Sequence, residues 1–148
     1  MRELSWKSQV ALAGFGFALS ILVIVGWAVQ NHAEAKARTT LLSDLGQLKT
    51  NAHVRLNDRD VGEAAPFLLS LNRLTTVQAH HSSPTTSIQV EIDDGSSAVV
   101  VVIARDSERP DEYWIFRPDA SLPNEPNGRY AGRVSDPHLS ALLRRWGL

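Results

Sequence analysis

The chain has 148 residues, with 15 basic and 16 acidic side chains and a formal net charge of -1 at pH 7. This balance does not give the positive surface that binds a phosphate backbone, so we expect no nucleic-acid partner. The chain has no cysteine, which excludes disulfides, thiolate nucleophiles and zinc–thiolate centres.

An uncharged apolar segment lies near the N-terminus and runs from Val10 to Val29. A helix of about twenty residues spans roughly 30 Å, the thickness of the hydrocarbon core of a bilayer. Trp6 and Trp27 lie near its two ends, where indole rings prefer the headgroup region. We therefore predict a short tail over residues 1–9 and a transmembrane helix over residues 10–29.

A cleaved signal peptide is the alternative, because the small residues Ala33, Ala35 and Ala37 follow the segment. The apolar region of a signal peptide is usually only about 7–15 residues long. The length of the segment therefore favours an anchor that is retained.

Small residues recur at helical spacing in the first half of the segment. Gly14 and Ala18 are four residues apart, and so are Gly16 and Ser20. Small residues at this spacing let two helix backbones approach closely in lipid. We expect these four residues to pack against other membrane helices.

Basic residues are nearly balanced on the two sides of the segment, with Arg2 and Lys7 before it and Lys36 and Arg38 after it. The positive-inside rule therefore favours neither orientation. Because a very short N-terminal tail usually stays in the cytoplasm, we predict that the soluble part lies outside it. For a bacterium, this describes a single-pass protein of the inner membrane with a periplasmic domain.

A polar stretch follows the segment, and within it Leu41, Leu45 and Leu48 recur at helical spacing. This pattern predicts a juxtamembrane helix over residues 30–60 that continues from the membrane helix. Its narrow apolar stripe could pack on the chain's own domain or on another protein. The three leucines are therefore candidate docking residues.

The remaining residues, 61–148, predict one small soluble domain of the α+β class. Helical spacing of apolar residues predicts a helix that starts near Asp60 and ends near His80. Alternating or continuous apolar runs then predict strands over residues 88–92, 98–104, 113–116 and 129–134. A last helix is expected from Asp136, a favourable cap, with Pro137 in its first turn. We expect an antiparallel meander of three to four strands packed with helices.

No combination of residues points to a catalytic or metal site. His80 and His81 would point about 100° apart on a helix, which is poor geometry for a shared metal. Asp93 and Asp94 precede Gly95 in a predicted turn, where aspartate is favoured for its own backbone hydrogen bonds. The chain also lacks the phosphate-binding, dinucleotide-binding and nucleophile-elbow motifs. We therefore predict no enzymatic activity, no metal and no cofactor.

The densest polar patch lies between the second and third of these strands, over residues 105–112. Arg109, Tyr113 and Trp114, in and beside this patch, belong to the residue types that dominate protein–protein hot spots. These three are further candidate docking residues. The alternative is a solvated hairpin in which Tyr113 or Trp114 is buried in the core.

These features together predict a non-enzymatic, single-pass accessory subunit of a larger membrane protein complex. Its expected partners are other integral membrane proteins and the lipid bilayer. The order of tail, anchor, juxtamembrane helix and small domain is also found among bitopic bacterial subunits, although such an analogy names no partner.

A membrane-tethered ligand-binding or sensory domain is the alternative, and it requires an apolar pocket near Val100 and Trp114. A tethered hydrolase is the third hypothesis, because catalytic sites can be assembled from scattered residues.

Overall fold

The computed structural model describes residues 6–49, 51–56, 59–75, 82–119 and 127–148. Of residues 6–14 it describes the helical backbone alone. The chain divides into two compact units, Met1–Ala33 and Glu34–Leu148.

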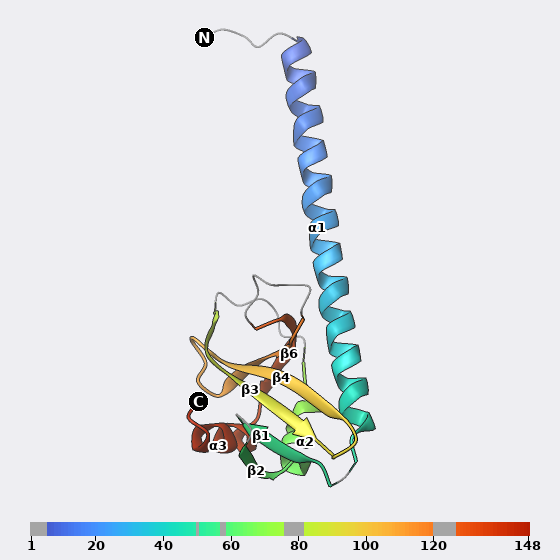
Figure 1. Cartoon of the computed structure of the whole chain (residues 1–148). Coiled ribbons are helices and arrows are strands. Elements are labelled where there is room, and N and C mark those ends of the chain that lie inside the picture. The colour runs from blue at the N-terminus through green and yellow to red at the C-terminus, as the bar shows by residue number, and fades with distance from the viewer. Residues whose placement is uncertain (1–5, 50, 57–58, 76–81, 120–126) are drawn as a thin grey trace. The chain divides into compact units, whose positions relative to one another are not determined.

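Helix α1 (Trp6–Gln47) is 42 residues long and contains the apolar segment (Figure 1). From residue 15 onward, the large apolar side chains of α1 in the first unit are exposed, and Phe15 and Phe17 are each 71% exposed. A continuous apolar surface of this kind is unfavourable in water. Helix α1 is long and apolar enough to cross a membrane. Helix α1 continues beyond the apolar segment as far as Gln47.

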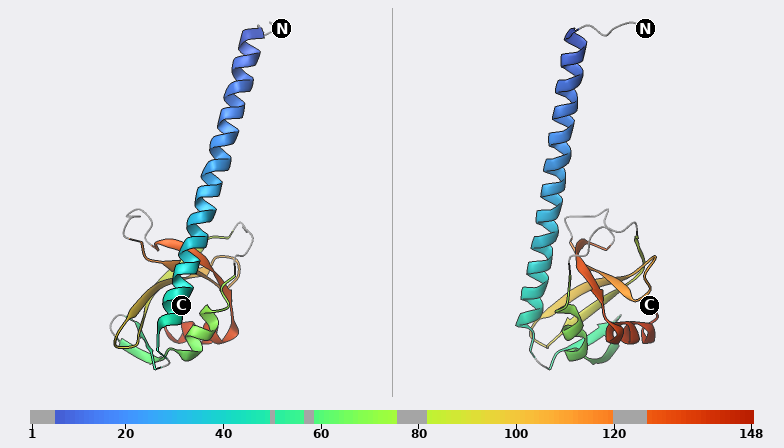
Figure 2. Two further views of the ribbon diagram at one scale, coloured as in Figure 1. Left: turned by 90° about the vertical axis from the view of Figure 1, so that its right-hand side faces the viewer. Right: turned by 180° about the vertical axis from the view of Figure 1, so that it is seen from behind.

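The second unit is built on a six-stranded antiparallel sheet with the strand order β2-β1-β3-β4-β5-β6. Its strands are β1 (His53–Leu56), β2 (Arg59–Glu63), β3 (Pro84–Asp93), β4 (Ala98–Asp106), β5 (Glu112–Arg117) and β6 (Arg129–Ser135). Helices α2 (Ala65–Leu71) and α3 (Pro137–Arg145) lie side by side (Figures 1 and 2). The predicted α+β class is confirmed.

The number of strands differs from the prediction, because six strands form where three to four were expected. The four expected strands are β3 to β6, which form a meander. Strand β1 lies within residues 30–60, where the leucine spacing predicts a helix. Helix α1 instead ends at Gln47, directly after Gly46, and the buried Val54 and Leu56 then alternate with exposed neighbours. This alternation is typical of a strand. It covers only four residues, which is too few to outweigh the helical spacing of the leucines before it.

Helix α2 is shorter than predicted. It begins after Ala64 and ends at Leu71. Asp60, near which the helix was expected to start, lies in β2, where its Oδ1 accepts a hydrogen bond from the Gly62 N–H at 2.9 Å. The last part of the predicted helix, residues 76–80, lies outside the described residues.

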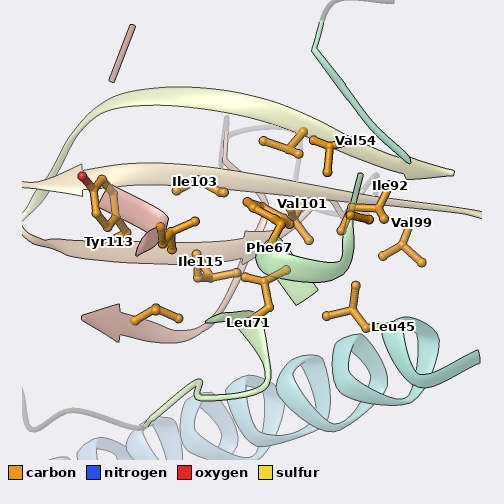
Figure 3. Close-up of a cluster of buried hydrophobic side chains, with 14 of the residues drawn as sticks. Leu45, Val54, Phe67, Leu71, Ile92, Val99, Val101, Ile103, Tyr113 and Ile115 are labelled. Atoms are coloured by element: carbon orange, nitrogen blue, oxygen red, sulfur yellow. The ribbon is translucent and has the colours of Figure 1, made fainter. Parts of the chain in front are cut away.

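The main core lies between the helices and one face of the sheet (Figure 3). Phe67 and Leu71 of α2 and Leu45 of α1 point toward this face. Leu139 and Leu143 of α3 join them. The buried sheet residues on this face are Val54, Leu56, Val90, Ile92, Val99, Val101, Ile103, Tyr113, Ile115, Ala131 and Val134. Each large apolar side chain that is fully buried contributes about 1.5–3 kcal/mol to stability, so this core holds α2, α3 and the end of α1 on the sheet.

A smaller cluster lies on the opposite face of the sheet. It contains Val102, Ala104 and Phe116, with Trp114 and Tyr130 packed beside them. The Trp114 and Phe116 rings are nearly parallel, with centroids 6.3 Å apart, and the Tyr130 ring is inclined to both. Aromatic pairs of this kind contribute about 0.5–1.5 kcal/mol beyond their buried area. The cluster therefore stabilises the pairing of β4, β5 and β6.

The predicted turn after β3 and the predicted cap of α3 are both confirmed. In the turn, Asp94 Oδ1 accepts hydrogen bonds from the N–H groups of Ser96 and Ser97, each 2.8 Å long. At the start of α3, Asp136 Oδ1 accepts a hydrogen bond from the His138 N–H at 2.8 Å. Both carboxylates therefore satisfy backbone donors, which is the usual reason for aspartate at these positions.

Candidate functional site

Three of the four predicted helix-packing residues, Gly16, Ala18 and Ser20, lie exposed on α1, and Gly14 lies one turn before Ala18. A Cβ atom at Gly16 would have no neighbour within 4 Å. The Ser20 hydroxyl donates to the Gly16 carbonyl at 2.9 Å. The Ser20 hydroxyl therefore has no unsatisfied hydrogen-bond donor in an apolar environment.

The two pairs of small residues lie on different faces of α1. Because an α-helix has about 3.6 residues per turn, residues two positions apart point roughly 160° away from each other. Gly14 and Ala18 therefore share one face, and Gly16 and Ser20 share the opposite one. A single partner helix can contact only one of these faces closely.

The two predicted interface tryptophans are both in α1. Trp6 is its first residue, and Trp27 is 68% exposed farther along the helix. At a rise of about 1.5 Å per residue, the two positions are about 30 Å apart along the helix axis. This separation matches the hydrocarbon thickness of a bilayer.

The leucine stripe packs on the chain's own domain. Leu41 is 0% exposed and Leu45 is 4% exposed, and both belong to the main core. Leu48 is half-buried against the same core. Of the two alternatives that the sequence allows, the structure shows packing within the chain. Leu41 and Leu45 therefore offer no open surface to a partner.

Polar contacts fix the same end of α1 within the second unit. Arg117 Nη2 lies 2.9 Å from Asp44 Oδ2, and the Lys49 N–H donates to Asp94 Oδ2 at 2.9 Å. Hydrogen bonds from Ser96 and then Lys49 hold the pKa of Asp94 well below its usual value. The end of α1 is therefore an integral part of the domain.

The loop between β4 and β5 is organised by Asp106, whose side chain is fully buried. Its Oδ1 accepts hydrogen bonds from the N–H groups of Glu108 and Arg109, both at 2.9 Å. Its Oδ2 accepts a hydrogen bond from Trp114 Nε1 at 2.8 Å. Burial raises the pKa of Asp106, but the hydrogen bonds outweigh burial and lower the pKa to about 2. Asp106 is therefore ionised at neutral pH and holds the loop in one conformation.

Arg133 of β6 provides the positive charge beside this carboxylate. Its side chain is 3% exposed, and Nη1 lies 3.4 Å from Asp106 Oδ2 and 3.5 Å from Glu112 Oε2. Its guanidinium carbon lies 3.8 Å from the centroid of the Trp114 ring, within the range of a cation–π contact. Glu112 Oε1 also accepts a hydrogen bond from Arg109 Nη1 at 2.7 Å. Buried charges of this kind seldom stabilise a fold more than apolar packing does, so we infer that they mainly fix the geometry of the loop.

The three predicted docking residues in this region take different positions. Tyr113 is 1% exposed and belongs to the main core. Trp114 is half-buried in the aromatic cluster on the other face. The Arg109 side chain is 49% exposed, and all of residues 107–111 are exposed. Arg109 and the loop around it are therefore the part that a partner can reach.

Sequence reasoning does not identify Arg133, because its place beside Trp114 depends on an irregularity in β6. The pairing of β6 with β5 shifts by one residue at Ala131, which forms a β-bulge. Residues three apart normally point to opposite faces of a strand. The bulge instead places Tyr130 and Arg133 on one face, both in contact with the Trp114 ring.

A polar groove of about 270 Å³ lies beside β1 and the β3–β4 turn. It is lined by Asn51, His53, Arg55, Asp60, Asp93, Asp94 and Gly95. Four of the lining side chains contact one another in pairs, since His53 Nδ1 lies 2.9 Å from Asp60 Oδ2 and Arg55 Nη2 lies 2.9 Å from Asp93 Oδ2. Within the described part of the chain, no group of three or more His, Asp or Glu residues is arranged to hold a metal ion. The groove differs from the apolar pocket that the ligand-binding hypothesis requires.

Comparison with known proteins assigns no family to this chain, since no family model, curated protein or solved structure matches it. A functional conclusion therefore depends on two features of the chain itself. These are the exposed apolar part of α1 and the β4–β5 loop, whose geometry Asp106 and Arg133 fix.

Proposed function

We propose that this chain is a non-enzymatic, single-pass accessory subunit of a larger membrane protein complex. The observation that carries the proposal is the apolar part of α1, whose side chains from residue 15 to residue 29 are all exposed. A helix of this length is stable in a bilayer, because its backbone hydrogen bonds are satisfied internally. The second unit supports the proposal through its firm attachment to the end of the same helix, where Leu41 and Leu45 are buried.

In this proposal, α1 packs between two neighbouring membrane helices. Gly14 and Ala18 provide one narrow face, and Gly16 and Ser20 provide the opposite one. Close approach of helix backbones increases van der Waals packing, which drives helix association in lipid. Narrow faces on both sides suit a helix inside a larger assembly better than a helix in a simple dimer.

The loop over residues 107–111 is the second proposed attachment site. It is exposed along its whole length, with Arg109 at its centre. Asp106 and Arg133 already hold the loop in place, so little conformational entropy is lost when a partner binds it. We propose that it contacts a soluble part of the same complex.

We further propose that the anchor lies in a bacterial inner membrane with the second unit in the periplasm. A compartment-sensitive reporter fused after Leu148 tests this orientation. Activity of a reporter that works only in the periplasm is expected, and activity of one that works only in the cytoplasm would reverse the assignment.

Purification in mild detergent through a C-terminal tag tests the subunit proposal. We expect a defined set of membrane proteins to co-purify at stoichiometric ratio. The variant Gly16→Leu should lose part of this set, because a bulky side chain fills one narrow face. Gly26→Leu is the matched control, since it lies in the same segment, roughly 100° from either face, and a Cβ there has no neighbour within 4 Å.

The opposite face is tested by Ala18→Leu. Loss of different partners from Gly16→Leu and Ala18→Leu supports packing on both sides. A chain that purifies alone, with neither variant having an effect, contradicts the proposal. Equal losses from Gly16→Leu and Gly26→Leu would assign the effect to bulk anywhere on the helix and would remove the argument for specific faces.

A further inference from the structure

We draw no further inference here: the strongest candidate, the aromatic cluster of Trp114, Phe116 and Tyr130 on the sheet face opposite the helices, is an unpartnered apolar face, and nothing in the structure shows what covers it.

Discussion

The guanidinium carbon of Arg133 lies 3.8 Å from the centroid of the Trp114 ring on the neighbouring strand. The same guanidinium lies beside the carboxylates of Asp106 and Glu112, and Trp114 in turn donates to Asp106. Side chains from β4, β5 and β6 therefore form one network beneath an exposed loop. Loss of the Arg133 guanidinium leaves the buried Asp106 carboxylate without the cation that pairs with it, which is costly in a low-dielectric interior.

Replacement of Arg133 by methionine should destabilise the second unit by about 3–5 kcal/mol, because the buried Asp106 carboxylate then loses the cation that pairs with it. Urea unfolding of the full chain in mild detergent, followed by tryptophan fluorescence, measures this change. Arg109→Met is the matched control, since the Arg109 side chain is 49% exposed and its ion pair should contribute no more than about 1 kcal/mol. Equal losses in the two variants would show that Arg133 has no special role.

The low pKa of Asp106 predicts a loss of stability in acid. The pKa is about 2 in the folded domain and about 3.9 in an unfolded chain, so ionisation of this carboxylate favours the folded state. The contribution is fully present above about pH 4 and is lost as the pH falls toward about 2. It amounts to roughly 2 kcal/mol.

The variant Asp106→Asn isolates this effect, because asparagine keeps a side-chain oxygen for the loop N–H groups but does not ionise. Its free energy of unfolding should fall less than that of the wild type between about pH 4 and about pH 2. Asp111→Asn, an exposed position in the same loop, should follow the wild type. Parallel curves for the wild type and Asp106→Asn would show that another group titrates.

The elements that the sequence predicts correctly have patterns that are complete over a short stretch of chain. Ile88, Val90 and Ile92 alternate with polar residues, and Asp136 and Pro137 mark the start of a helix, so β3 and α3 need no knowledge of distant contacts. Strands β1 and β2 are different. Each has five residues or fewer. The helical spacing of the leucines before them, taken alone, predicts a helix that continues over the residues of β1.

The candidate site shows the same limit. Arg109 and Trp114 can be selected from the sequence by residue type, and both lie at the loop. Their neighbour Arg133 belongs to another strand, and the bulge at Ala131 decides which face it occupies. The burial of Tyr113 is also a property of the packed sheet, because a hydrophobic pattern of four residues does not show which of them faces the core.

Truncation of Leu45 tests whether the end of α1 belongs to the domain core. Leu45 is 4% exposed, so Leu45→Ala should leave a cavity and lower the free energy of unfolding by about 2–5 kcal/mol. Leu69→Ala is the control, because Leu69 is 65% exposed on α2 and should change stability by no more than about 0.5 kcal/mol. A neutral Leu45→Ala would mean that the helix leaves the core in solution, and the leucine stripe would again be open to a partner.

Two glycines allow substitutions with opposite expected signs. Gly128 has a φ of +81°, and a Cβ there would clash with the Arg117 carbonyl oxygen. Gly128→Ala should therefore destabilise the second unit by more than about 1 kcal/mol. Gly46 lies inside α1 with no neighbour within 4 Å of its Cβ position, so Gly46→Ala should stabilise it by about 0.4–1 kcal/mol. Urea unfolding measures both variants, and a destabilising Gly46→Ala would indicate that α1 is interrupted before Gln47.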